Sequence, residues 1–103
     1  MNITSTSADD SVIAIGINDE KLNKHQIEVL QYDQNNVWKQ LGSSLIVPLE
    51  PFSVKSYNLT ADGSVLAVCL RGEYFQPGKV KVRKYNEEKG DWSQEGNDIL
   101  INV

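Results

Sequence analysis

Two tryptophans recur in one local pattern, and their chemistry suits the binding of carbohydrate. Residues 37–47 read VWKQLGSSLIV and residues 91–101 read DWSQEGNDILI, so Trp38 and Trp92 each begin the pattern Trp-x-Gln-x-Gly. An aromatic face packs well against the C–H face of a sugar, and repeated weak sites combine into avidity. The alternative, which we favour, is that each tryptophan opens a strand and packs against a neighbouring structural unit.

A second pair of aromatic residues, Tyr74 and Phe75, is a further candidate for ligand binding. These residues lie in the loop predicted at 71–78, whose sequence differs from that of the corresponding segment 17–26. Loops that vary on a common scaffold often carry specificity. Both residues therefore join the two tryptophans as candidate binding residues.

The chain offers little material for catalysis or metal binding. Its one histidine, His25, falls in a segment predicted to be a loop, and we interpret it as a solvated residue rather than a base. The sequence contains no glycine-rich phosphate loop, Cys/His metal spacing or nucleophile elbow. Residues 18–20 supply oxygen ligands, but without the alternation and the turn glycine of a calcium loop. We predict a non-enzymatic protein with no catalytic residue, metal or cofactor.

The charge of the chain limits its partners. The net charge is −4 and the pI is near 4.8, whereas nucleic acid and anionic membrane surfaces require a basic patch. No apolar run approaches the roughly 18 residues of a membrane span. The opening residues MNITSTSADD lack the basic and apolar regions of a signal peptide, which favours a cytoplasmic location if the chain is complete.

Cys69 is the only cysteine, so the chain cannot form an intrachain disulfide. It lies in the run SVLAVCL at 64–70, in which the residues on both faces of the predicted strand are apolar. This pattern is typical of a strand covered on both faces. We therefore expect Cys69 to be a buried and unreactive thiol.

Residues 79–85, KVKVRKY, predict a strand with one basic face and one apolar face. Lys79, Lys81 and Arg83 alternate with two valines, and Lys84 adds a further charge. We interpret these cations as a solvated strand that protects a sheet edge, with a phosphate or an acidic partner as the alternative.

The chain consists of two copies of one unit. Residues 7–16 align with residues 60–69 at an offset of 53, and after one extra residue in the second copy the offset becomes 54. Ten aligned pairs are identical, where about three would arise by chance at background residue frequencies. The identical pairs are Ala8/Ala61, Asp9/Asp62, Ser11/Ser64, Val12/Val65, Ala14/Ala67, Val29/Val82, Tyr32/Tyr85, Trp38/Trp92, Gln40/Gln94 and Gly42/Gly96.

Each copy predicts four short antiparallel strands. In the second copy the strands are expected at 53–59, 64–70, 79–85 and 92–103, with the last strand broken near Gly96 by a bulge or bend. Asp62-Gly63 predicts a tight hairpin turn, because glycine accepts a positive φ and aspartate tolerates it. The first copy has Asp9-Asp10 there, for which we expect a longer or less tight turn. No window shows helical periodicity.

Four-stranded units that recur at about 50 residues are typical of β-propeller blades. We predict an all-β chain with a first repeat at 1–53 and a second at 54–103, which together form one structural unit. Pro48 and Pro51 mark the joint between them. A β-sandwich fits the number of strands equally well, but does not explain why the second half copies the first.

The second copy resembles the propeller-type repeat of proteins described as integrin-alpha-like, FG-GAP-like or kelch-like. The first copy departs from that pattern at Asp10 and Ser44, and the second at Cys69. This resemblance implies a fold unit that serves binding and scaffolding rather than catalysis. The residues that carry it are Ala61, Asp62, Gly63, Ser64, Ala67, Tyr85, Trp92, Gln94, Gly96, Asp98 and Ile99.

Two blades cannot close a propeller, which normally has four to eight. Such a pair leaves an apolar face open at each end, and an open apolar face is an interface or an aggregation hazard. We therefore predict an interaction or structural subunit whose fold is completed by other chains. Three or four copies can form a ring, or the chain can join a larger complex; it can also be a piece of a longer propeller. The alternative function is a lectin-like module that binds glycans through the repeated tryptophans.

Overall fold

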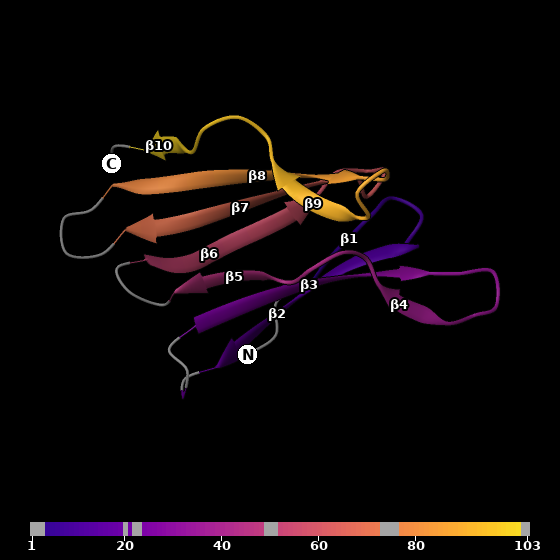
Figure 1. Cartoon of the computed structure of the whole chain (residues 1–103). Coiled ribbons are helices and arrows are strands. Elements are labelled where there is room, and N and C mark those ends of the chain that lie inside the picture. The colour runs from indigo at the N-terminus through magenta and orange to yellow at the C-terminus, as the bar shows by residue number, and fades with distance from the viewer. Residues whose placement is uncertain (1–3, 20, 22–23, 49–51, 73–76, 102–103) are drawn as a thin grey trace.

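The structure is a computed structural model that describes residues 4–19, 21, 24–48, 52–72 and 77–101. Within these residues it contains ten strands and no helix, and the strands form two antiparallel sheets (Figure 1). The strands are β1 (Thr4–Thr6), β2 (Val12–Asp19), β3 (Lys24–Tyr32), β4 (Trp38–Gln40), β5 (Leu45–Pro48), β6 (Phe52–Leu59), β7 (Val65–Gly72), β8 (Gly78–Asn86), β9 (Asp91–Gln94) and β10 (Ile99–Ile101).

Each sheet corresponds to one of the two sequence repeats, except that β6 of the second sheet begins at Phe52, before the predicted start of the second repeat at residue 54. Sheet A contains β1 to β5 and sheet B contains β6 to β10. In each sheet the first three strands pair in chain order, and the third strand then pairs with two short segments that share the place of a fourth strand. The break in that strand falls at Gly42 in sheet A and at Gly96 in sheet B, which have φ of 74° and 73°. The predicted bend at Gly96 is confirmed.

The hairpin turns after β1 and β6 are the same, so the expectation of a looser turn in the first repeat is wrong. Asp10 has φ of 60° and Gly63 has φ of 75°, because the short side chain of aspartate tolerates the left-handed region. The carboxylates of Asp9 and Asp62 each accept hydrogen bonds from a backbone amide and from two hydroxyl groups. These bonds hold both pKa values below the usual range, to about 2 for Asp62.

Two segments predicted as loops are shorter than expected. The strand pair β2–β3 continues to Asp19 and begins again at Lys24, so most of the predicted loop at 17–26 is strand. In the second repeat β7 extends to Gly72 and β8 begins at Gly78. Backbone pairing continues past the apolar runs because polar residues such as those of β3 can occupy a strand when the ladder provides their hydrogen bonds.

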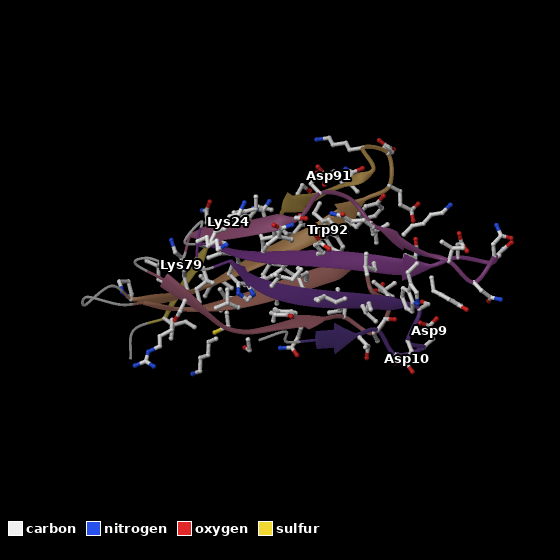
Figure 2. The ribbon with its side chains drawn as sticks, turned by 90° about the horizontal axis from the view of Figure 1, so that it is seen from below. Asp9, Asp10, Lys24, Lys79, Asp91 and Trp92 are labelled. Carbon is white, nitrogen blue, oxygen red and sulfur yellow. The ribbon has the colours of Figure 1, made fainter. Side chains whose placement is uncertain are left out.

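The two sheets share one core. They form two layers in Figure 1, and their strands overlap when the molecule is turned by 90° in Figure 2. Leu41, Leu45, Val54, Leu59 and Trp92 pack around the buried residues. Those buried residues are Val12, Ala14, Ile27, Val29 and Val47 of sheet A and Tyr57, Leu66, Val68 and Leu70 of sheet B.

Candidate functional site

Strand register divides each sheet into two faces that are equivalent in the two repeats. We call the face of sheet B that faces sheet A the front face of repeat 2; β7 contributes Leu66, Val68 and Leu70 to it. The alternate residues of β7 belong to the back face, namely Val65, Ala67 and Cys69. At the offset of 53, the front face of repeat 1 contains Ile13, Ile15 and Ile17, and its back face contains Val12, Ala14 and Gly16.

The two repeats pack head to tail. The buried core joins the back face of repeat 1, including Val12 and Ala14, to the front face of repeat 2, including Leu66 and Val68. A two-fold arrangement would instead bring the same face of both repeats together. Within the described residues, no other element of the chain covers the front face of repeat 1 or the back face of repeat 2.

Trp92 anchors the contact between the repeats. Its indole Nε1 donates a hydrogen bond of 2.7 Å to the backbone carbonyl of Leu41. Its ring lies over Gly42, where an added Cβ would be 2.7 Å from the ring atom Cδ1. Tyr85 meets the ring edge-on at 5.5 Å. This placement agrees with the alternative that the sequence favoured, in which the tryptophan packs against a neighbouring unit.

Asp91 adds a polar bond between the repeats next to Trp92 (Figure 2). Its carboxylate accepts a hydrogen bond of 2.8 Å from the backbone amide of Ser43 and one of 3.1 Å from the Ser43 hydroxyl. Hydrogen bonds from the backbone amides of Ser43 and, next in size, Trp92 hold the pKa of Asp91 below its usual range. Asp91 therefore stays ionised and bonded to repeat 1 at neutral pH.

His25 is buried between the repeats, so its assignment to a solvated loop is wrong. It lies in β3 and is 3% exposed. A Cβ added at Gly16 would lie 2.7 Å from both His25 Nε2 and the Tyr57 hydroxyl oxygen, so the three residues form one tight contact. Burial lowers the pKa of the imidazole, because desolvation disfavours its charged form. Burial also raises the pKa of Tyr57.

The open front face of repeat 1 carries large apolar side chains. Trp38 is 42% exposed and stacks at a tilt on Tyr32, with ring centroids 4.9 Å apart. Ile17 on β2 and Ile46 on β5 are exposed too. The residues that are equivalent to Ile13 and Ile15 are fully buried in repeat 2, so this face differs from its counterpart in what covers it.

The open back face of repeat 2 is a second apolar surface. Val65, Ala67, Cys69, Val80 and Val82 are all partly exposed on it. Ile99, which pairs with Val80, is 56% exposed. The equivalent residues of repeat 1 are buried against repeat 2. The expectation that Cys69 is buried therefore does not hold in the single chain, where the thiol is half-buried.

Three of the four cations of β8 belong to the front face of repeat 2, whereas Lys84, which pairs with Val65, belongs to its back face. Register places Lys79, Lys81 and Arg83 beside Leu70, Val68 and Leu66, which confirms their predicted separation from the valines. The expectation of a solvated strand is wrong in part, because Lys79 and Lys81 are half-buried. The Lys81 ammonium lies 3.0 Å from the Asp98 carboxylate, and that of Lys79 lies 3.7 Å from it.

The structure places the two tryptophans among the predicted binding residues on different surfaces. Trp38 lies on the open front face, whereas Trp92 is engaged between the repeats. Tyr74 and Phe75 lie outside the residues that the structure describes.

A cavity of about 230 Å³ lies beside Trp92, between the two sheets. Ser43, Ser44, Arg83 and Asp91 line it together with apolar side chains. The Nε atom of Arg83 is buried there without a hydrogen-bond partner in the described part of the chain. A wider hollow of about 490 Å³ lies by Cys69, Pro77 and Ile101 at the edge of the open back face.

The polar contacts between the repeats were not predicted from the sequence. Ser43 and Asp91 have Asn97 and Val37 as their counterparts, so this bond leaves no trace in the repeat alignment. The contact of Tyr57 with Gly16 is likewise not repeated in the sequence, since Thr4 and Cys69 occupy the corresponding positions. The signal in the sequence that did indicate a contact between the repeats was the presence of apolar residues on both faces of β2 and β7.

These observations define an all-β protein of two antiparallel sheets, each with one face that no other described part of the chain covers. A scan against protein-family models finds no matching family, and searches of curated proteins and of solved structures find no match either. Among the described residues, none of the elements is a helix that could span a membrane, and no cluster of three or more His, Cys, Asp or Glu residues could hold a metal ion.

Proposed function

We propose that this chain is an interaction module of two propeller-type blades that acts by association with other chains. The observation that carries the proposal is the head-to-tail packing of the repeats, which uses the back face of repeat 1 and the front face of repeat 2. The same operation can be applied again at either end. Burial of the open faces supplies the free energy of association, since removal of apolar area from water is favourable.

The blade interpretation explains more than a sandwich does. A closed sandwich has two sheets that cover each other and polar outer faces. Here the outer faces carry Ile15, Ile17 and Trp38 on one side and Val80 and Val82 on the other. Each sheet is also an antiparallel meander of the blade type, with the first strand of repeat 2 close to the first strand of repeat 1 through the bond from the Leu59 amide to the Ser5 hydroxyl.

The native mass in solution tests this proposal. A single species of three or four chains supports a ring that the chain closes with itself, and a larger complex isolated with other subunits supports incorporation. The measurement is light scattering on a sizing column over a range of concentrations. A folded chain that remains at 11.5 kDa throughout, and that binds no other protein, would falsify the proposal.

A second candidate function is carbohydrate binding in the cavity beside Trp92. Arg83, Asp91 and the serines Ser43 and Ser44 place charged and hydroxyl groups around one aromatic side chain. Convergent polar groups beside an aromatic surface are typical of small-ligand sites. The buried Nε atom of Arg83 is a donor that a sugar hydroxyl could satisfy.

Trp fluorescence and a glycan array test this second candidate. Binding should quench Trp92, and the quenching should be lost in Arg83→Gln but kept in Trp38→Phe, which lies on another face. No binding to any glycan, with both variants folded, would exclude carbohydrate recognition at this cavity.

A further inference from the structure

The chain makes one tryptophan contact between repeats and contains both halves of a second that it does not make. Trp92 covers Gly42, whereas nothing lies within 4 Å of a Cβ added at the equivalent Gly96. Trp38, the equivalent of Trp92, is 42% exposed on the open front face. One repeat thus presents an indole that no other repeat covers, and the other presents a glycine that no indole covers.

The backbone around Gly96 matches the backbone that receives Trp92. The Leu41 amide donates to the Val29 carbonyl at 2.7 Å, and the Glu95 amide donates to the Val82 carbonyl at 2.8 Å. Gly42 and Gly96 then have nearly equal positive φ. The Glu95 carbonyl is therefore set relative to its own sheet as the Leu41 carbonyl is, and the Leu41 carbonyl accepts the indole N–H of Trp92.

The differences between the repeats fit a second junction of the same kind. At the existing junction the large Tyr57 side chain meets Gly16. The corresponding residues on the open faces are Thr4 and Cys69, a smaller residue opposite a larger one. This exchange keeps the summed side-chain volume closer to constant than a change at either position alone, as packing between sheets requires.

The open faces also differ in their charged residues. The open back face carries Arg71 and Lys84, by the alternation of β7 and the pairing of Lys84 with Val65. The open front face carries Lys24 and Glu28 by the alternation of β3, and Glu28 stands where repeat 2 has Lys81. Glu28 in place of Lys81 makes the front face of repeat 1 less positive than that of repeat 2, where Asp98 contacts Lys79 and Lys81 but leaves Arg83. The front face of repeat 1 is therefore the better match for the cations of the open back face.

We infer that the open back face of repeat 2 binds the open front face of repeat 1 of a second copy, with the Trp38 indole N–H donating to the Glu95 carbonyl. This inference rests on the proposed function and names its partner and its register. The contact is heterologous, so each copy keeps one face for the next, and the copies close into a ring if the rotation between them divides the circle.

One position fits this register less well than its counterpart. A Cβ at Gly63 would lie 2.8 Å from Cγ2 of Val12, so glycine allows the close approach of that turn. In the second junction the turn residue is Asp10 and it would approach Val65. Replacement of Asp10 by glycine should therefore tighten the association between copies several-fold, as measured by the dissociation constant in analytical ultracentrifugation.

Two blocked variants test the inference directly. Ile15→Lys places a charge on the front face of repeat 1, and Ala67→Lys places the same charge on the back face of repeat 2. Each variant alone should run as a monomer of 11.5 kDa, because one face of every contact is blocked. An equal mixture should form a heterodimer of twice that mass, because each variant keeps the face that the other has lost. Circular dichroism and thermal unfolding verify that both variants fold.

Other outcomes overturn the inference in distinguishable ways. If the wild-type chain assembles but the mixture stays monomeric, or if only one variant loses assembly, the contact joins like faces or other surfaces, and the head-to-tail register is wrong while the proposed association stands. If the folded wild-type chain shows no association at any concentration and no other partner, the proposed function fails as well.

The Cys69 thiol provides a readout that needs no charge on the back face. Cys69 should react with a maleimide more slowly in the assembled wild-type chain than in Ile15→Lys, because the second copy covers it. In the mixture of the two variants, the Cys69 thiol of Ile15→Lys should become protected and that of Ala67→Lys should not. Equal rates in every sample would overturn the inference even if one lysine variant failed to fold.

Discussion

Repeat 1 and repeat 2 have the same backbone and different surroundings. Both have the same strand order, the same turn bonds at Asp9 and Asp62, and the same break at Gly42 and Gly96. Yet Ala14 is fully buried, whereas Ala67 at the equivalent position is partly exposed. Local sequence therefore accounts for what is common to the repeats, and the neighbour on each face accounts for what differs.

The comparison also separates two kinds of substitution between the repeats. Changes such as Asp10 for Gly63 keep the local conformation, since both residues accept a positive φ. Changes such as Gly16 for Cys69 follow the residue that each position meets across the junction. The back face of repeat 1 and the front face of repeat 2 thus carry residues that fit each other, as expected when packing between sheets is heterologous.

The largest expected effect comes from truncating equivalent side chains on the covered and the open front faces. Leu66→Ala removes a fully buried side chain and should lower the free energy of unfolding by about 3 kcal/mol. Ile13→Ala at the equivalent position should cost about 1 kcal/mol in the monomer, since that side chain is already partly exposed. Urea unfolding at low concentration measures both, and equal losses would contradict the assignment of one covered and one open face.

The next largest difference is expected between alanine substitutions at Gly42 and Gly96, the glycines at which the last strand of each sheet is broken. Gly42→Ala adds strain at positive φ and drives a Cβ to 2.7 Å from the Trp92 ring, for a total of about 3 kcal/mol. Gly96→Ala adds only the backbone strain, about 1 kcal/mol. Thermal unfolding of the pair gives the difference. If Gly96→Ala proved the more damaging in a dilute monomer, the described placement of Trp92 would be wrong.

A smaller effect concerns pH. Burial holds the pKa of His25 below its usual value of 6.5, so at mildly acidic pH the unfolded chain binds a proton that the folded chain does not. Stability from this residue is therefore complete above pH 6.5 and is lost as the pH falls from there toward the folded pKa. Unfolding in urea at pH 7.5 and at pH values below 6.5 should show this loss in the wild type.

The His25→Gln variant is the control for this pH dependence. It lacks the titrating group, so its stability should change much less over the same range. The carboxylates of Asp9, Asp62 and Asp91 contribute only at lower pH, because their pKa values are lowered from 3.8. An unchanged pH profile in His25→Gln would show that another residue is responsible.

The smallest effect is expected for one substitution at a hairpin turn, Asp10→Gly. Asp10→Gly relieves a non-glycine residue of its positive φ at the cost of chain entropy, for a net change of a few tenths of a kcal/mol. Gly63→Ala should be clearly destabilising instead, because its Cβ would press on Val12. Urea unfolding compares the two, and a large loss in Asp10→Gly would mean that the Asp10 side chain has a role beyond the turn.

Much of the fold could be predicted from the sequence because it depends on local chemistry. Apolar residues on both faces of β7 and the alternation of cations with valines in β8 predicted these strands, and Gly96 predicted the break in the last strand. The mistakes came from contacts between distant residues. His25 was assigned to a loop because its neighbours are polar, and only its place opposite Tyr57 explains its burial.

The sequence by itself determined the repeat, the four-stranded unit and the presence of two apolar faces on each unit, since these follow from strand periodicity and turn residues within a few positions of one another. The tertiary structure decided which of those faces is covered. That choice depends on contacts such as Trp92 with Leu41 and Ser43 with Asp91, which join residues 51 and 48 positions apart. Residues so far apart leave no local pattern, because each side chain is compatible with its own strand whether or not the other repeat lies against it.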